Sequence, residues 1–161
     1  VDGLKTGHTS GAGFNLIASA VDGQRRLIAV VMGADSPKGR EQQAAKLLHW
    51  GQQNFDTVQV LQNGKKVGTE RIWYGDKETI DLGTDQDFWL ALPKKEIPNI
   101  KAKYVLDGKE LEAPIAAHQR VGEIQLYDRD KIVAHWPLVT LESVKKGGMF
   151  SRLSDYFHHK A

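Results

Sequence analysis

The sequence contains no cysteine, which excludes disulfide bonds and thiolate metal sites. It has no apolar run close to the roughly 20 residues that cross a bilayer as a helix, and we see no signal peptide at its start. Its 22 basic and 20 acidic side chains give a net charge of +2, so no strong field favours nucleic acid or another polyanion as a partner. The lack of cysteine fits an exported protein as well as a cytoplasmic one, so composition leaves the compartment open.

What is present fits a soluble globular chain. Its 161 residues are 40% hydrophobic and 26% charged, which is enough for one ordinary core or two small ones. The sequence begins at Val1 rather than methionine, and the first five residues are typical of the approach to a strand. We therefore expect the N-terminus to be a cut.

Two strand-like runs near the start predict an antiparallel hairpin. Residues 14–20 and 26–32 are strand formers, and Asp22-Gly23 between them is a turn signal. Because the second run is almost continuously apolar, we expect that strand to be covered on both faces. A hairpin by itself cannot supply that cover.

A helix is predicted after the hairpin. Ser36 is suited to cap it, Pro37 to occupy its first position, and residues 40–53 are good helix formers. Spacings of three and four define an apolar stripe that would lie against the sheet of the hairpin: Ala44, Ala45, Leu47, Leu48, Gly51 and Phe55. Residues 1–55 are therefore expected to end a larger α/β unit.

From Asp56 onwards the sequence consists of short apolar runs separated by turn signals such as Asn63-Gly64 and Asp107-Gly108. This spacing favours a small β-sandwich or barrel. The clearest hairpin pairs residues 121–127 with 131–136. Its apolar surface is expected from Val121, Ile124, Leu126, Ile132, Val133 and Trp136.

Residues 146–161 carry another helical apolar stripe, formed by Met149, Phe150, Leu153, Tyr156 and Phe157. Basic residues flank it, and Gly147-Gly148 before it is a flexible joint. A short helix of this kind can lie in the headgroup plane of an anionic bilayer, and it can also pack on its own domain. The residues alone leave both interpretations open.

One motif with chemical meaning is Lys5-Thr6-Gly7 on the first strand. In serine acyltransferases that recognise penicillin, this triplet lines the edge of the active-site groove. As a bare tripeptide it is a weak signal, because a lysine on an edge strand also serves to prevent aggregation.

The context of the triplet strengthens the signal. The sequence resembles the low-molecular-mass penicillin-binding D-alanyl-D-alanine carboxypeptidases of Gram-negative bacteria over essentially its whole length. Besides the triplet, the resemblance is carried by Gly39-Arg40-Glu41, Leu47-Leu48-His49-Trp50-Gly51, Ile72-Trp73-Tyr74-Gly75-Asp76, Val121-Gly122 and Trp136-Pro137-Leu138-Val139.

The resemblance implies an exported enzyme that removes the terminal D-alanine of peptidoglycan pentapeptides through an acyl-serine intermediate. It also implies acylation by penicillins and no cofactor. Lys5, Thr6 and Gly7 would belong to the catalytic site, and Thr6, His8 and Thr9 would bind substrate. Lys5 would stabilise the developing oxyanion, and the Thr6 hydroxyl would meet the free carboxylate of the substrate. Gly7 would let the substrate approach the strand, and the backbone N–H of His8 would be one oxyanion donor.

The nucleophile that this family uses is missing from the sequence. It stands in Ser-x-x-Lys, is followed by Ser-x-Asn, and both motifs precede the Lys-Thr-Gly triplet. The one Ser-x-x-Lys here runs from Ser143 to Lys146, after the triplet, and we interpret it as accidental. None of the six serines begins Ser-x-Asn. We therefore expect the chain to be inactive by itself.

No metal site is predicted. His158 and His159 are adjacent, and on a helix their side chains would point about 100° apart. The spacing of His49, His118 and His135 does not suggest ligands either.

Together these observations predict an α+β chain in three parts. Residues 1–55 would be the final strands and helix of a transpeptidase domain of the penicillin-binding and β-lactamase type. Residues 56–145 would be a small all-β sandwich, and residues 146–161 an amphipathic anchor. Phe150, Leu153 and Phe157 would bind the anionic inner-membrane surface from the periplasm.

Two further expectations concern partners. The chain could instead be a non-catalytic module whose β-domain holds a partner near the membrane. In residues 1–55, strands without their covering elements should expose a large apolar face, and we expect a symmetric homodimer through it.

Overall fold

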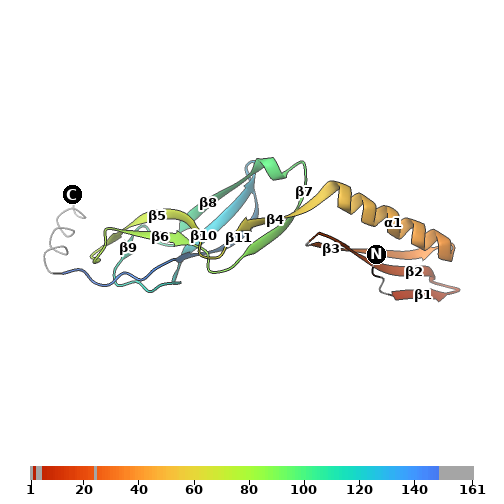
Figure 1. The fold of residues 1–161 in the computed structure, drawn as a ribbon, viewed down its shortest axis with the longest axis horizontal. Coiled ribbons are helices and arrows are strands. Elements are labelled where there is room, and N and C mark those ends of the chain that lie inside the picture. Colours follow the sequence, from red (N-terminus) through yellow and green to blue (C-terminus); the bar gives the residue numbers. More distant parts are fainter. Residues whose placement is uncertain (1, 3–4, 24, 149–161) are drawn as a thin grey trace. The chain divides into compact units, whose positions relative to one another are not determined.

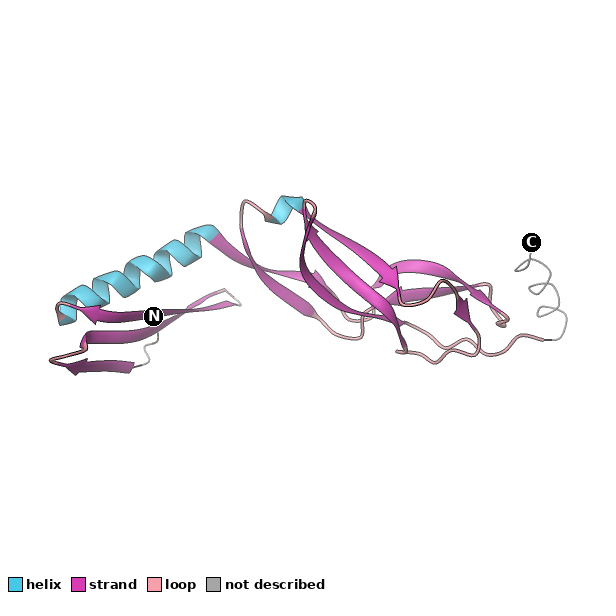
Figure 2. Cartoon of the chain, turned by 180° about the vertical axis from the view of Figure 1, so that it is seen from behind, coloured by secondary structure: helices cyan, strands magenta, loops and turns pink. Residues whose placement is uncertain are grey.

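The computed structural model describes residue 2, residues 5–23 and residues 25–148, which are mostly β-structure with one α-helix (Figures 1 and 2). They divide into two compact units. The described residues of Val1–Thr57 form the first unit together with Ala91–Lys95. Val58–Leu90 and the described residues from Glu96 onwards form the second.

The first unit is a three-stranded antiparallel sheet with a helix on one face (Figure 1). The strands β1 (Lys5–Thr9), β2 (Gly13–Asp22) and β3 (Arg25–Ala34) lie in the order β1-β2-β3. The predicted hairpin is confirmed, with Val21 opposite Arg26 across the turn.

The predicted helix is also confirmed, as α1 (Pro37–Asn54). The hydroxyl oxygen of Ser36 accepts a hydrogen bond from the backbone N–H of Gly39 at 3.0 Å, which satisfies one of the free donors of the first turn.

The core between α1 and the sheet is built from small side chains: Ala18, Ala20, Ala29, Val31, Ala34, Ala44 and Leu48. Alanines let the helix approach the strands closely, and a Cβ added to Gly51 would lie only 3.4 Å from Cδ1 of Leu27. The predicted stripe is correct at Ala44 and Leu48 but wrong at Ala45 and Leu47, which are exposed. The sheet contacts only one side of the helix, and these two side chains point away from that side.

The other face of the sheet is not covered by described residues. Five large apolar side chains are exposed on it, namely Ile17, Val21, Ile28, Val30 and Met32, the last with 78% of its surface accessible. The expectation that the second strand is covered on both faces is therefore wrong for the described chain, because α1 covers only one. The expected exposure of a large apolar face is confirmed.

Arg25 joins the hairpin turn to the end of α1. Its side chain, only 10% exposed, forms an ion pair with Asp22 and donates to the backbone oxygens of Gln52, at 3.1 Å, and of Phe55. It also lies 3.6 Å from Asp56. A buried guanidinium with several acceptors satisfies the free carbonyls at the C-terminal end of the helix.

Replacing Arg25 with alanine should loosen this junction. Because buried acceptors then lose a charged donor, we expect the free energy of opening of the β2–β3 hairpin to fall by about 2–4 kcal/mol. Hydrogen exchange of the hairpin amides measures this value. Lys46→Ala, on the exposed side of α1, is the control and should change it by less than about 0.5 kcal/mol. Equal protection in both variants would contradict the assignment.

The second unit contains most of the strands. A six-stranded sheet has the order β8-β10-β11-β6-β5-β9, and β4 and β7 form a two-stranded sheet. The bounds are β4 (Phe55–Leu61), β5 (Lys66–Trp73), β6 (Thr79–Gly83), β7 (Phe88–Pro93), a 3-10 turn η1 (Ile97–Asn99), β8 (Ile100–Leu106), β9 (Leu111–Glu112), β10 (Arg120–Asp128) and β11 (Lys131–Thr140).

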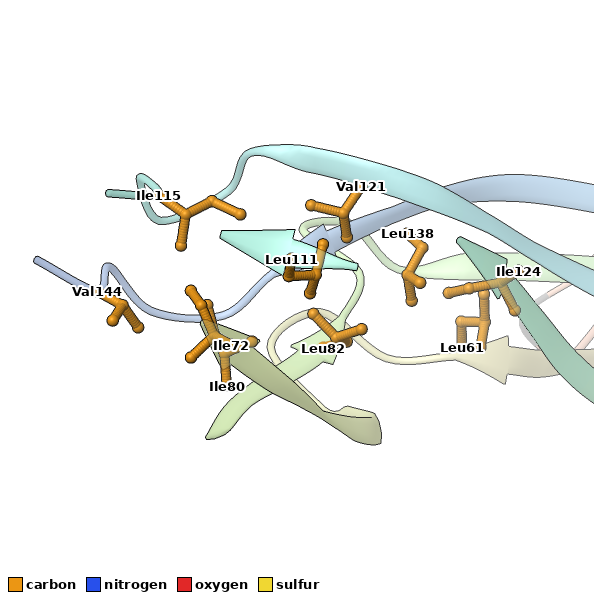
Figure 3. Close-up of a cluster of buried hydrophobic side chains, with 10 residues drawn as sticks. All are labelled: Leu61, Ile72, Ile80, Leu82, Leu111, Ile115, Val121, Ile124, Leu138 and Val144. Atoms are coloured by element: carbon orange, nitrogen blue, oxygen red, sulfur yellow. The ribbon is translucent and has the colours of Figure 1, made fainter. Parts of the chain in front are cut away.

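Branched aliphatic side chains fill the interior of this unit (Figure 3): Leu61, Ile72, Ile80, Leu82, Leu111, Ile115, Val121, Ile124, Leu138 and Val144. The predicted hairpin is confirmed as β10 and β11, which are antiparallel with Leu126 opposite Ala134. Ile132 and Val133 are 48% and 40% exposed, so the expectation that they supply core surface is wrong. They stand next to the hairpin turn, beyond the main cluster of the core.

The last described segment is bound to the second unit. Val144 and Ile115 exchange backbone hydrogen bonds of 3.0 Å, and the N–H of Gly147 donates to the carbonyl of Tyr74 at 2.8 Å. Within the described part of the chain, no helix has the length and apolar character of a membrane span. The predicted anchor residues Phe150, Leu153 and Phe157 lie outside the described residues.

Candidate active site

The candidate site is the strand β1, which carries Lys5-Thr6-Gly7. It stands at the edge of its sheet, and all five of its residues are exposed. Only β2 pairs with it among the described strands, with Lys5 opposite Ile17 and Thr6 opposite Leu16. An exposed edge of this kind can accept an extended peptide as a further strand.

The register divides the predicted site residues between the two faces of the sheet. Residues directly opposite each other share a face, so Lys5 lies on the face of Ile17 and Val30, which α1 does not cover. Thr6 and His8 alternate to the other face. At the strand edge, the triplet therefore places the Lys5 ammonium on one face of the sheet and the Thr6 hydroxyl on the other.

Gly7 leaves the strand open between Lys5 and Thr9. An ideal Cβ at this position would have no atom within 4 Å, so the uncovered face offers free space beside the backbone. Lys5 has no ion pair among the described residues. Thr9 has a structural role, because its side-chain oxygen accepts from the N–H of Ala12 at 3.0 Å and fixes the turn into β2.

His8 is held by aromatic stacking. Its ring lies 4.0 Å from the ring of Phe14, with an angle of 23° between the planes. The guanidinium carbon of Arg40, in the first turns of α1, lies 5.8 Å from the same Phe14 ring. One Nη of Arg40 approaches the carbonyl of Asn15 at 3.5 Å.

Arg40 is a residue that the sequence analysis did not assign to the site. Its Nε is buried and has no hydrogen-bond partner among the described residues. A buried donor without a partner is unusual in proteins, which makes Arg40 a candidate for binding an acceptor. The signal available in the sequence was its place in Gly39-Arg40-Glu41, which carried part of the resemblance.

The described serines are not arranged as a nucleophile. Ser19 contacts the guanidinium of Arg26, and Ser36 caps α1. Ser10 lies in the turn after β1, and Ser143 belongs to the other unit. No hydrogen bond joins any of these four hydroxyls to a lysine or histidine side chain in the described ranges.

One ion pair on the surface, between Asp2 and Arg26, lies near the start of the chain. Asp2 and Arg26 lie 2.6 Å apart, and this hydrogen bond lowers the pKa of Asp2 below its ordinary value. In the described part of the chain, no three histidine, cysteine, aspartate or glutamate side chains gather as metal ligands.

Comparison with models of known protein families shows to which family the chain belongs. A model described as the C-terminal domain of penicillin-binding protein 5 matches residues 55–146, more than half of the sequence. The chain belongs to this family. A second model, described as D-alanyl-D-alanine carboxypeptidase, matches residues 1–36, which include Lys5-Thr6-Gly7.

Two curated relatives illustrate the likeness to low-molecular-mass penicillin-binding proteins. D-alanyl-D-alanine carboxypeptidase DacD of Escherichia coli K12 is 85% identical over 161 residues, which are 100% of this chain and 42% of that protein. DacA of the same organism is 45% identical over 163 residues, covering 99% of this chain and 40% of DacA. The chain thus spans about two fifths of the length of these relatives.

Solved structures agree. Penicillin-binding protein 5 from Haemophilus influenzae matches with a TM-score of 0.76 and 42% identity, over 89% of this chain and 42% of that one. Penicillin-binding protein 6B from Escherichia coli matches with a TM-score of 0.61 and 65% identity, over 86% of this chain and 34% of that one. The family resemblance expected from the sequence is confirmed.

Proposed function

We propose that this chain supplies the Lys-Thr-Gly strand and the β-rich unit of a serine D-alanyl-D-alanine carboxypeptidase that is acylated by penicillins. The substrate would be a peptidoglycan pentapeptide, and the site of action the periplasmic surface of the inner membrane. The observation that carries the proposal is Lys5-Thr6-Gly7 on an exposed edge strand, within a segment that matches the carboxypeptidase family.

In the proposed reaction, a serine outside this chain attacks the carbonyl of the penultimate residue. The Lys5 ammonium lies beside the strand and stabilises the negative charge that develops on the carbonyl oxygen. The C–N bond then breaks, D-alanine leaves with a proton, and water hydrolyses the acyl-serine. The exposed backbone of β1 holds the substrate, and the open space beside Gly7 permits close approach.

The terminal carboxylate of the substrate needs a cationic partner as well as the Thr6 hydroxyl. Arg40 is suited to this role because its planar guanidinium matches a carboxylate and its buried Nε has no acceptor among the described residues. The Phe14 ring, which stacks on His8, also lies close to the guanidinium. Arg40 would therefore approach the edge of β1 from the helix side of the sheet.

The nucleophile decides activity, and a labelling experiment tests the proposal. The isolated chain should form no covalent adduct with a fluorescent penicillin, because Lys5, Thr6 and His8 can polarise and position but cannot attack. Fusing the chain to the upstream part of DacD, which it resembles at 85% identity, should restore labelling. A fusion that folds but takes no label would refute the proposal, and labelling of the isolated chain at Ser143 would refute its inactivity.

We propose the same three parts as the sequence predicts, 1–55, 56–145 and 146–161. The separate core of the β-rich unit and the family match to residues 55–146 support the second part. The third part begins on the β-rich unit, because the backbone N–H of Gly147 donates to the carbonyl of Tyr74. An anchor would therefore start from a fixed point on that unit.

Residues 146–161 should bind anionic vesicles weakly and reversibly. Phe150, Leu153 and Phe157 would enter the headgroup region, and each basic charge of the flanks would add about 1 kcal/mol near the surface. Co-sedimentation with vesicles that contain phosphatidylglycerol measures the bound fraction. Phe150→Asp should reduce it several-fold, whereas Phe88→Tyr, in the β-rich unit, should not. An unchanged bound fraction for Phe150→Asp would contradict the anchor.

A second candidate function is a non-catalytic module that holds a partner near the membrane. The self-contained core of the β-rich unit favours it, since that unit does not need the first one for its interior. Failure of the DacD fusion to label would favour this module. In the isolated chain, the exposed face of Ile17, Ile28, Val30 and Met32 would associate in a dimer, and a monomer by light scattering at high concentration would exclude that.

A further inference from the structure

The second unit contains a cavity of about 290 Å³ between strand β8 and the segment that runs from the end of β4 into the start of β5. Its walls come from three segments, residues 59–62, residues 65–67 and Ala102. All of them belong to the second unit, so the cavity is independent of the candidate active site.

The cavity lies beside a small side chain of β8, that of Ala102, whereas the next residue on the same face of the strand, Tyr104, has a large one. Ala102 and Tyr104 are two residues apart on β8, so their side chains point to the same face of the sheet. The Tyr104 ring fills the space between β8 and β5 so closely that a Cβ on Gly68 would lie 2.5 Å from it. Tyr104 is fixed by donating to Glu70 at 2.8 Å, and this hydrogen bond raises the pKa of Tyr104 above its ordinary value. At Ala102 no ring is present, and the space remains.

The lining combines an apolar floor with a polar rim. Val60, Leu61 and Val67 are half-buried or buried and belong to the core of the unit. The rim is formed by the amides of Gln59 and Gln62 and by the ammonium groups of Lys65 and Lys66. An apolar floor with a few polar groups is the usual composition of a small-molecule site.

The acidic groups near the rim already have partners. Asp81 accepts from the Thr69 hydroxyl at 2.7 Å and lies 3.3 Å from Lys66, and these contacts lower its pKa. Asp87 accepts from Gln59 at 2.9 Å and from the N–H of Asn63 at 2.8 Å.

Lys65, in contrast, has no ion pair within the described ranges. Among the described residues of the rim, Lys65 is therefore a cation without an ion-pair partner, and Asp87 has only neutral hydrogen-bond donors. The rim also offers amides that can both donate and accept.

We infer that this cavity binds a small ligand that carries a carboxylate beside an amide group, of about the size of an acidic dipeptide. The carboxylate accepts from the Lys65 ammonium, and the amide of the ligand meets Gln59 or Gln62. Acidic peptides and acidic N-acetylated sugars share this chemistry. Because the rim is exposed, we expect dissociation constants of about 1 mM.

Backbone amide NMR of the full chain tests the inference with N-acetyl-alanyl-glutamate and N-acetylmuramic acid as probes. Saturable shifts are expected at residues 65–67 and at Ala102 with at least one probe, and the responding probe identifies the ligand source. The uncharged controls are the dipeptide with both carboxyl groups amidated and N-acetylglucosamine. They should bind about tenfold more weakly because they lack the carboxylate.

Two variants test the site itself. Lys65→Gln should weaken binding about tenfold, whereas Lys109→Gln, an exposed lysine of the same unit outside the cavity, should leave it unchanged. Ala102→Leu should abolish binding by filling the cavity without changing charge. No saturable shifts with either acidic probe, equal binding of the uncharged controls, or equal effects of the two lysine variants would overturn the inference. None of these outcomes depends on penicillin labelling.

Discussion

Replacing Lys5 with alanine in the DacD fusion is expected to slow acylation by penicillin by about 10²- to 10³-fold. The fully exposed strand β1 presents this ammonium on the face of the sheet that α1 leaves uncovered. In the proposed mechanism, removing it deletes the positive charge that would stabilise the oxyanion, while the strand that would hold the substrate remains. The rate of labelling under single-turnover conditions measures the loss.

The control for this prediction is Lys38→Ala. Lys38 is also an exposed lysine of the first unit, but it lies in the first turn of α1. Its replacement should leave the labelling rate within a factor of about two. If both variants are acylated at the rate of the unchanged fusion, Lys5 has no part in the chemistry and the proposed site is wrong.

Replacing Gly122 with alanine should cause the largest loss of stability in the β-rich unit. The Cβ would lie 2.1 Å from the carbonyl oxygen of Val105 and 2.9 Å from the Cα of Leu106. Both are backbone atoms of the neighbouring strand β8, which cannot move without breaking its pairing with β10. We expect the free energy of unfolding to fall by at least about 3 kcal/mol and Tm to fall by more than about 10 °C.

Thermal unfolding followed by circular dichroism measures this effect. Gly108→Ala is the matched control, because its nearest contact would be the Glu110 carbonyl at an ordinary 3.8 Å. That substitution should change Tm by less than about 2 °C. A Gly122→Ala variant whose Tm lies within about 3 °C of that of the unchanged chain would contradict the prediction, because β8 could then move to accommodate the Cβ.

Local signals in the sequence predicted the regular elements well. Ser36 and Pro37 define the start of α1 because capping depends on residues within one turn of the chain. The β10–β11 hairpin was visible because its turn residues and its alternating apolar side chains are adjacent in sequence. The prediction of Lys5 as a site residue on a strand also depends only on a short motif, Lys5-Thr6-Gly7.

Errors arose where a residue's environment depends on distant segments. Leu47 stands three residues after buried Ala44, which is a helical spacing, yet it is 48% exposed because the sheet contacts only part of the helix surface. Ile132 and Val133 are apolar strand residues, but they extend past the core of the unit. The pairing of β5 with β9, which is parallel, could not be read from turn signals, because the two strands are distant in the chain.

The sequence by itself determined the family, the Lys-Thr-Gly strand, the hairpins and the helix, because each depends on residues that are near one another or on a pattern shared with relatives. Only the tertiary structure decided that Lys5 lies on the face that α1 leaves uncovered, that Arg40 and His8 both lie close to the Phe14 ring, and that Ala102 leaves a cavity beside Lys65. These relations depend on strand register and on packing between segments, and such contacts are set by the whole fold rather than by local propensity.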